Sequence, residues 1–437
     1  MKRTLNSKAA TLVAAFLYAL AGKPAFADNR SDASPDIEVV PLAFSTEVMG
    51  FSAGMAGLWK GAGQPQASLF AAGLGTTKGT WMGFAAANNY LLSADSRWLL
   101  GGQFYEADFK QFDFYLGHAA ANDSPYDGRT TADSRDAQHH LSFRYILPWG
   151  AATENPIRAA LSPVREVTGS APWESGVSSV EFRPFYHSRT LTGEGVNTPS
   201  AFSDATSVRG LETRFKWDNR DSGNRPTTGS ASELIVSFDP GSDDSVSWWK
   251  WEVNQSWFWD VGEWDSIAKE QVLALNVYTA DTPSWNDTST INGQLEFRRP
   301  PEFAAARLGG LYRLRSFQSG RYADRSALSY SAEYRVVPEW QPLGDLPVFN
   351  WYQVPWWQWV LFADVGRVAD DYDLATLHQD MKWSAGAAMR FQVEGIVVRS
   401  EMAVGSEEGM FRVMINQPFD SKAGRVASRL FFTRPVA

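Results

Sequence analysis

The chain has 437 residues, a formal net charge of −9, 19 tryptophans and no cysteine. The missing cysteine excludes a disulfide framework and thiol chemistry, and the acidic balance argues against nucleic acid as a partner. Beyond the first 27 residues no continuous apolar run reaches the length of a membrane helix, and the mean hydropathy is −0.29, which together exclude a helical membrane protein.

Residues 1–27 have the pattern of a secretory signal peptide. Three basic residues precede a mostly apolar run over residues 9–21, and an Ala-Phe-Ala sequence ends at Ala27. We therefore expect cleavage after Ala27, followed by a short N-terminal segment in the periplasm, residues 28–42, which begins with the polar residues 28–36. The exported chain is then either a soluble all-β protein, which buries its apolar faces against each other, or an outer-membrane barrel, which turns them to lipid.

Segments with alternating polar and apolar residues follow at the spacing of antiparallel strands. The expected strands are residues 43–57, 67–75, 79–90, 96–105, 109–117, 138–147, 178–191, 210–217, 230–238, 245–261, 267–280, 328–336, 357–367, 382–393, 396–404 and 410–419. This even number, sixteen, returns both ends of residues 43–419 to the periplasm and leaves residues 420–437 as a tail. Residues 148–176 match no expected element, although the strand count places them at a periplasmic turn.

The clearest of these strands is residues 245–261. One face carries mainly tryptophan and valine, and the other carries polar residues: Trp249, Trp251, Val253, Trp257, Trp259 and Val261 against Lys250, Glu252, Asn254 and Ser256. A soluble sandwich would need a second sheet to bury this tryptophan row, whereas lipid needs no partner and tryptophan favours its interface. The pattern therefore favours a transmembrane antiparallel β-barrel, an all-β fold.

The longest insertion between two expected strands, residues 281–325, is too long for a simple connection in a compact domain. Its second half is rich in glycine and arginine and has too few apolar residues for a core of its own. The strand that follows has strict period-two alternation from Leu328 to Val336. We expect a basic loop with a functional role.

Short motifs in and after this insertion resemble those of the BamA/TamA superfamily of outer-membrane assembly and translocation barrels, the bacterial surface antigen domain. They are Leu314-Arg315-Ser316-Phe317, Glu333-Tyr334-Arg335 and Phe362-Ala363-Asp364-Val365-Gly366, with Asp218-Asn219-Arg220-Asp221 earlier in the chain. The last expected strand, with Phe411, Val413, Ile415 and Phe419, resembles the terminal aromatic signal for outer-membrane insertion. Two departures are Ser316, where the family usually has glycine, and the eighteen residues after Phe419.

The resemblance implies a sixteen-stranded barrel in the bacterial outer membrane whose sixth extracellular loop, residues 281–325, folds into the lumen. It implies that Arg315 pairs with Asp364, with Glu333 and Arg335 also on the inner wall, and that residues 43–51 meet residues 410–419 at a weak seam. The implied activity is insertion, translocation or transport of protein or lipid, without POTRA modules. The implied partners are outer-membrane lipid and lipopolysaccharide, a protein or lipid client, and the barrel assembly machinery during biogenesis.

Two other functions fit the same sequence: a passive diffusion channel, and a structural or adhesin barrel without transport. An enzyme is not expected. His140 and Ser142 have the spacing of a catalytic pair in outer-membrane phospholipases, but alternation places them on the inward face. Five histidines without spaced carboxylates predict no metal site, and the absence of a phosphate loop predicts no nucleotide cofactor.

Overall fold

The computed structural model of the chain describes residues 36–46, 50–194, 196, 201–342, 354–393, 396–407, 409–415 and 433–436. Seventeen strands form one antiparallel sheet, in which each strand pairs with the next in chain order. They are β1 (Asp36–Thr46), β2 (Gly50–Lys60), β3 (Ser68–Thr76), β4 (Trp81–Leu91), β5 (Trp98–Phe114), β6 (Thr130–Ile146), β7 (Val177–Thr192), β8 (Ser207–Arg220), β9 (Gly229–Asp239), β10 (Trp248–Trp264), β11 (Ala268–Asp281), β16 (Ser326–Pro338), β17 (Trp357–Ala369), β18 (Lys382–Val393), β19 (Ile396–Gly405), β20 (Gly409–Ile415) and β21 (Thr433–Val436). The signal peptide expected at residues 1–27 lies outside the described residues.

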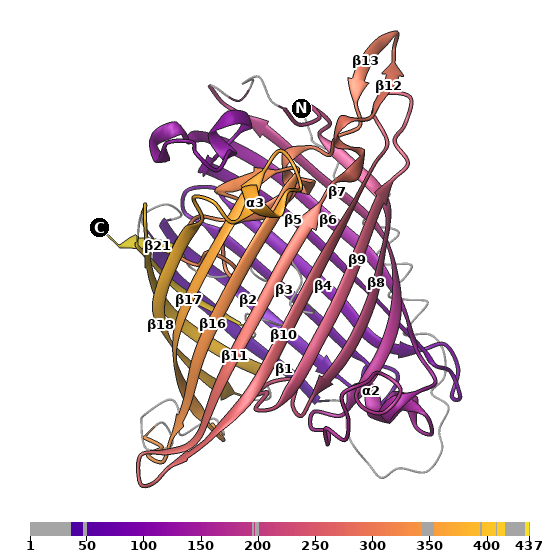
Figure 1. Cartoon of the computed structure of the whole chain (residues 1–437), viewed down its shortest axis with the longest axis vertical. Helices are drawn as coiled ribbons and strands as arrows, with labels where there is room; N and C mark the ends of the chain where they lie inside the picture. Colours follow the sequence, from indigo (N-terminus) through magenta and orange to yellow (C-terminus); the bar gives the residue numbers. More distant parts are fainter. Residues whose placement is uncertain are drawn as a thin grey trace.

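The sheet curls so that its first strands form the far wall behind β9 to β17 (Figure 1). The expected all-β barrel architecture is confirmed. None of the helices in the described part of the chain is long and apolar enough to span a membrane.

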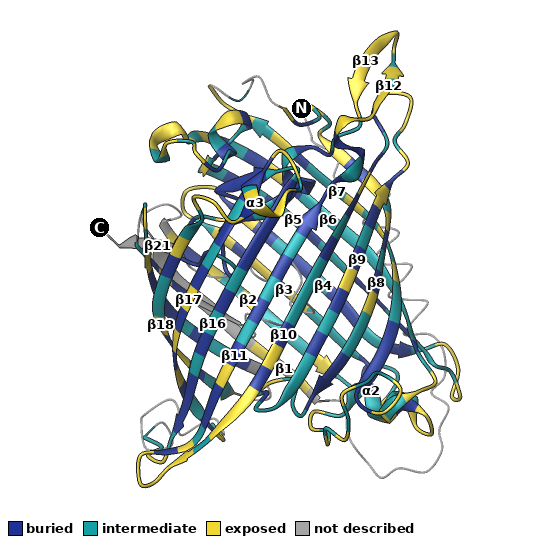
Figure 2. Cartoon of the chain, viewed as in Figure 1, coloured by how far each residue is buried: buried dark blue, intermediate teal, exposed yellow. Residues whose placement is uncertain are grey.

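Burial across the sheet is the reverse of that in a soluble protein. Along β10, Lys250, Glu252 and Ser256 are buried, whereas Trp249 and Trp259 on the other face are 38% and 45% exposed. Figure 2 shows exposed residues next to buried ones along the strands that face the viewer. Six arginines are among the largest fully buried side chains of the described residues. Because soluble proteins bury apolar side chains first, a polar interior with an apolar exterior is the arrangement of a barrel in lipid.

The expected strand count differs from the structure at both ends of the sheet. Residues 43–57 do not form one strand but fall within the hairpin β1–β2, in which Ala43 lies opposite Ala53. The sequence there has no Pro or Asn-Gly turn signal to divide it. At the other end, β21 from the expected tail pairs with β20, so that Gly409 lies opposite Val436.

Residues 96–105 and 109–117, expected as two strands, belong largely to the single strand β5. Its polar segment around Glu106 and Asp108 has the composition of a turn, but these residues continue the ladder with β6. The irregularity comes slightly later, where the register shifts between Phe109 and Phe112 and Gln111 has a φ of +55°. A bulge of this kind bends a strand without ending it. The undivided hairpin β1–β2 and the divided strand β5 are opposite errors in the expected count and cancel. The strand β21 is then the seventeenth.

The two ends of the barrel carry different connections, which we call the loop end and the turn end. The loop end has η1 (Gly117–Ala120), η2 (Tyr126–Gly128) and α3 (Leu374–Leu377). At the turn end, residues 148–176 contain η3 (Gly150–Ala152) and α2 (Pro156–Leu161) (Figure 1). Ala152 and Ala160 pack there against Leu99, Ile146 and Val177 from β5, β6 and β7. This small apolar core explains the long turn for which the sequence predicted no element.

Candidate functional site: a buried arginine loop

Residues 282–325 connect β11 to β16 and contain four short strands and two 3-10 helices. After η4 (Pro283–Asn286), β12 (Thr288–Ile291) and β13 (Gln294–Phe297) form an exposed hairpin that projects from the loop end (Figure 1). After η5 (Glu302–Ala304), β14 (Ala306–Leu308) pairs with β15 (Tyr322–Asp324). Residues 309–321 between these two strands form a segment that we call the tip.

The tip turns tightly because several of its residues adopt positive φ. Gly309 and Gly310 have φ values of +92° and +119°, and a Cβ on Gly309 would overlap the carbonyl oxygen of Gln318. The non-glycine residue that takes this conformation in the tip is Leu314, with a φ of +48°. Ser316 does not have positive φ. Its departure from the family's glycine therefore requires no backbone strain at that position.

Arg315 is fully buried and binds two carboxylates on neighbouring strands. Its Nε and Nη2 donate to the two oxygens of Asp364 on β17, at 3.0 and 2.7 Å, and its backbone N–H donates to the same carboxylate at 3.0 Å. Its Nη1 donates to Glu333 on β16 at 2.5 Å. The guanidinium lies 3.6 Å from the ring centroid of Phe362. A planar fork that fills two acceptors at once is the geometry that arginine provides and lysine does not.

Glu333 is the centre of a larger buried charge cluster. Besides Arg315, it accepts hydrogen bonds from Arg335, at 2.8 Å to Nε, and from Arg390 on β18, at 2.7 Å. Glu401 on β19 lies 4.0 Å from Arg315. Buried charges are tolerated only when they are paired, and each of these groups has an opposite charge beside it.

Two further arginines of the sheet bind the backbone of the tip instead of a carboxylate. Arg412 on β20 donates to the carbonyls of Gly310, Arg315 and Phe317 at 2.5–2.6 Å, and Arg399 on β19 donates to the carbonyl of Leu311 at 2.7 Å. The carbonyls of a buried irregular segment need such donors. The tip is thus held by side chains from β16 to β20, five consecutive strands of the sheet.

Apolar contacts and close approaches complete the fit of the tip against the sheet. Leu314 and Phe317 are fully buried in a cluster with Tyr278, Leu308, Tyr322 and Val368, among others. A Cβ on Gly366 would lie 3.0 Å from Leu308 Cδ1, and one on Gly405 would overlap the hydroxyl of Ser316. Glycine at these two positions leaves the space that the loop occupies.

A second set of contacts lies nearer the loop end. Arg321 donates through Nε and Nη2 to both oxygens of Glu407, at 2.8 and 2.7 Å, and Glu407 lies in the connection between β19 and β20. The same guanidinium donates to the carbonyls of Ala119 and Ser124, in the connection between β5 and β6. Arg321 therefore joins three connections that are far apart in the sequence.

A protein-family model supports the resemblance of the motifs. Residues 180–394 match the Omp85 superfamily domain. This chain carries an Omp85 superfamily domain. The match confirms the family resemblance of the motifs and the localisation in the outer membrane of Gram-negative bacteria.

No curated protein sequence significantly matches the chain. Solved structures with a similar fold include BamA from Haemophilus ducreyi lacking POTRA domains 1–3 (14% identity, TM-score 0.49, 93% of this chain and 77% of that chain covered). CdiB from Escherichia coli follows (11% identity, TM-score 0.48, 85% and 58% covered), as does CdiB from Acinetobacter baumannii (9% identity, TM-score 0.46, 85% and 62% covered). The chain thus spans less than two thirds of either CdiB chain.

The Omp85 domain brings together the residues of three separate motifs. Arg315, Asp364 and Glu333 form one cluster, Arg335 joins it through Glu333, and Phe362 lies beneath the guanidinium. The sequence motifs did not include four other residues of the site, although alternation places three of them, Arg399, Glu401 and Arg412, on the inward face of the last strands. Glu407 lies in a connection, where no periodic pattern marks it.

Two other predicted groups of residues lie outside the matched residues 180–394. Of the expected insertion signal, Phe411 is exposed on β20, and Val413 and Ile415 are also residues of this strand. Phe419 lies outside the described residues. On β6, Ser142 donates to Glu181 and His140 lies 2.5 Å from an Arg183 nitrogen. Within the described residues these two side chains are bonded to different partners and not to each other.

Proposed function

We propose that this chain inserts or translocates protein or lipid at the outer membrane, and that residues 282–325 plug its lumen until a client opens it. The observation that carries the proposal is the complete burial of Arg315 between Asp364 and Glu333. Burying a guanidinium without a partner would cost several kcal/mol, so Arg315 is stable in the interior only where both carboxylates reach it. This requirement fixes the position of the loop.

A charged anchor suits a plug that must move. Buried charges that lose their partners become stable again once water reaches them, whereas an apolar interface of the same size stays costly to expose. The tip is also bound by residues of β16 to β20, so a displacement of the loop and a deformation of these strands would accompany each other. This coupling supports a function in which the last strands of the sheet open to a client.

Conductance of the purified protein in planar lipid bilayers tests the plug. The wild-type chain should give small, irregular openings, and deletion of residues 283–322 should give large, stable ones. Deletion of the exposed hairpin alone, residues 288–297, is the matched control because it removes loop sequence without removing the tip. It should behave as the wild type, and equally small openings after both deletions would contradict the plug.

A passive diffusion channel is the second candidate, since a cavity of about 500 Å³ lies along the inward face of β3 to β9. The same recordings distinguish the two functions. Large and stable openings of the wild-type chain would favour the channel. Crosslinking at β1 and β20, followed by identification of the crosslinked molecules, would then show whether a client protein or lipid reaches this part of the sheet.

A further inference from the structure

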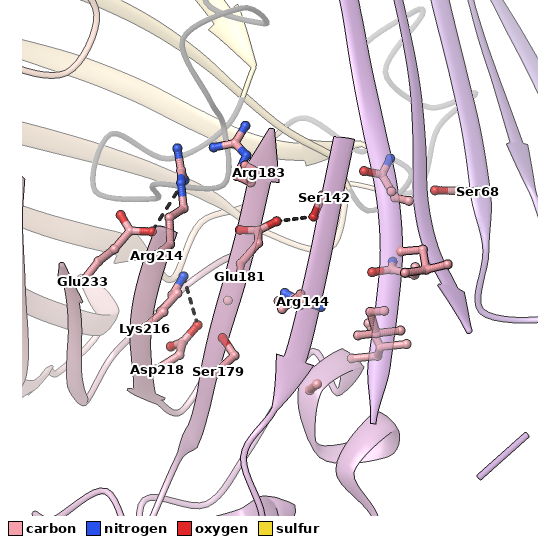
Figure 3. Close-up of a pocket in the computed structure, with 18 of the residues that line it drawn as sticks. Ser68, Ser142, Arg144, Ser179, Glu181, Arg183, Arg214, Lys216, Asp218 and Glu233 are labelled. Carbon is pink, nitrogen blue, oxygen red and sulfur yellow. Dashed lines mark hydrogen bonds and ion pairs between the residues drawn. The ribbon is translucent and has the colours of Figure 1, made fainter. Parts of the chain in front are cut away.

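A cavity of about 500 Å³ lies on the inward face of β3 to β9, away from the strands β16 to β20 that hold the tip and near the turn end. Its walls come from β3 to β9, with α2 and the residues after it at one end (Figure 3). Two adjacent glycines on β5, Gly101 and Gly102, line it without filling it. Its volume is within the range of small-ligand sites in proteins.

Positive charge dominates the lining of this cavity. Six cationic side chains and three carboxylates face it: Arg144, Arg165, Arg183, Arg214, Lys216 and Arg220 against Glu181, Asp218 and Glu233. Glu212, just beyond the lining, accepts from Arg183 at 2.7 Å and from Arg214 at 2.6 Å. Even with Glu212 included, two positive charges are in excess.

Three cations share the single carboxylate of Asp218. Arg220 donates through Nε and Nη2 to its two oxygens at 2.8 and 2.9 Å, whereas Lys216 and Arg165 form longer ion pairs with it, at 3.6 and 3.7 Å. Glu181 lies directly across from Arg144 on β7 but accepts its hydrogen bond from Ser142. In the described part of the chain, neither Arg144 nor Lys216 donates a hydrogen bond.

These two cations flank one strand. Arg144 on β6 lies opposite Glu181, and Lys216 on β8 lies opposite Ser179, two residues away on the same face of β7. Strand spacing and rise place their Cα atoms roughly 12 Å apart, a distance that two long side chains can close from both sides of one small anion. Figure 3 shows both side chains on the face of the sheet that lines the cavity.

We propose that this cavity binds a phosphate group, with Arg144 and Lys216 as its principal ligands. A tetrahedral oxyanion has enough acceptors to engage a guanidinium fork and an ammonium simultaneously, and its charge matches the two excess cations. The phosphate belongs either to a soluble compound or to a lipid headgroup, since the recognition chemistry is the same. This site does not rest on the proposed transport function, because its residues are separate from those that hold the tip.

Isothermal titration calorimetry on the full chain in phosphate-free detergent tests the site. Inorganic phosphate is one probe, and a short-chain phosphatidic acid below its critical micelle concentration is the other. We expect saturable binding of at least one probe, and Arg144→Gln and Lys216→Gln should each weaken it by about tenfold or more, the loss of one charge-assisted hydrogen bond. Tighter binding of the lipid would identify a headgroup, and tighter binding of inorganic phosphate a soluble ligand.

The matched control is Lys269→Gln, which removes one positive charge from an exposed position on β11 outside the cavity. It should bind phosphate as the wild type does. Folding of each variant is checked by its gel mobility before and after boiling, and Arg144→Lys, which keeps the charge, replaces Arg144→Gln if the latter does not fold. Equal affinity of the Arg144 variant and the Lys269 control, or no saturable binding of either probe, would overturn the proposal.

Discussion

Replacing Arg315 by alanine removes the guanidinium that joins the tip to the sheet and leaves Asp364 and Glu333 buried with fewer partners. Three side-chain hydrogen bonds to Asp364 and Glu333 disappear, at 3.0, 2.7 and 2.5 Å. Breaking a buried ion pair by removing one partner costs about 3–5 kcal/mol. Glu333 keeps Arg335 and Arg390, so most of the penalty falls on Asp364, and we expect a cost near the lower end, about 3 kcal/mol.

This cost should appear as exposure of the loop. A penalty of about 3 kcal/mol raises the open fraction of the loop roughly 100-fold. When opening and closing are faster than cleavage, the rate of proteolysis follows this open fraction. Subtilisin is a suitable protease because, unlike trypsin, its cleavage does not depend on the arginines of the tip. The substituted chain in lipid vesicles should therefore be cleaved within residues 309–321 about 100 times faster than the wild type.

Two variants make this measurement specific to the buried pairs. Arg315→Lys keeps the charge but loses the fork, so its cleavage rate should lie between those of the wild type and Arg315→Ala. Arg298→Ala removes an arginine of the same loop whose ion pair with Asp287, at 3.8 Å, is partly exposed, and it should leave the rate nearly unchanged. If Arg315→Ala and Arg298→Ala were cleaved at the same rate, the buried ion pairs would not hold the loop.

Three further predictions concern the fit of the loop, its pH dependence and the lipid face. Gly366→Ala should lower the free energy of unfolding by about 1–3 kcal/mol, because its Cβ would lie 2.9 Å from the Leu328 carbonyl oxygen and 3.0 Å from Leu308 Cδ1. A second substitution, Leu308→Ala, should recover only the part due to Leu308 in a double-mutant cycle, whereas Gly83→Ala, with open space around its Cβ, should cost little. Burial raises the pKa of Asp324 to about 6, above its value in the unfolded chain, so β14–β15 should become more stable as the pH falls through 6. Hydrogen exchange of this hairpin, corrected for the intrinsic rate, should show that trend and lose it in Asp324→Asn. Leu361→Arg on the exposed face of β17 should cost about 2–4 kcal/mol in urea titrations in vesicles if it lies near the bilayer centre, and no change would contradict its contact with lipid.

The position of the tip against the sheet could not be predicted from the sequence alone. The sequence predicted Arg315, Asp364 and Glu333 because each of them belongs to a short motif that resembles one of the family. The arginines that hold the backbone of the tip, Arg399 and Arg412, could not be paired in the same way. A carbonyl acceptor is common to every residue type, so no pattern in the sequence of the tip marks it as their partner.

The sequence by itself determined the two faces of the sheet. A period of two assigns each side chain of β10 or β17 to lipid or to the interior, and this requires only the geometry of an extended chain. Pairing and turns were decided by the tertiary structure: the hairpin β1–β2 lies where the sequence has no Pro or Asn-Gly signal, and β5 continues through a polar segment and a bulge. The same holds for the contact of Arg321 with Glu407, since a charge on an irregular connection finds its partner only when distant parts of the chain are folded together.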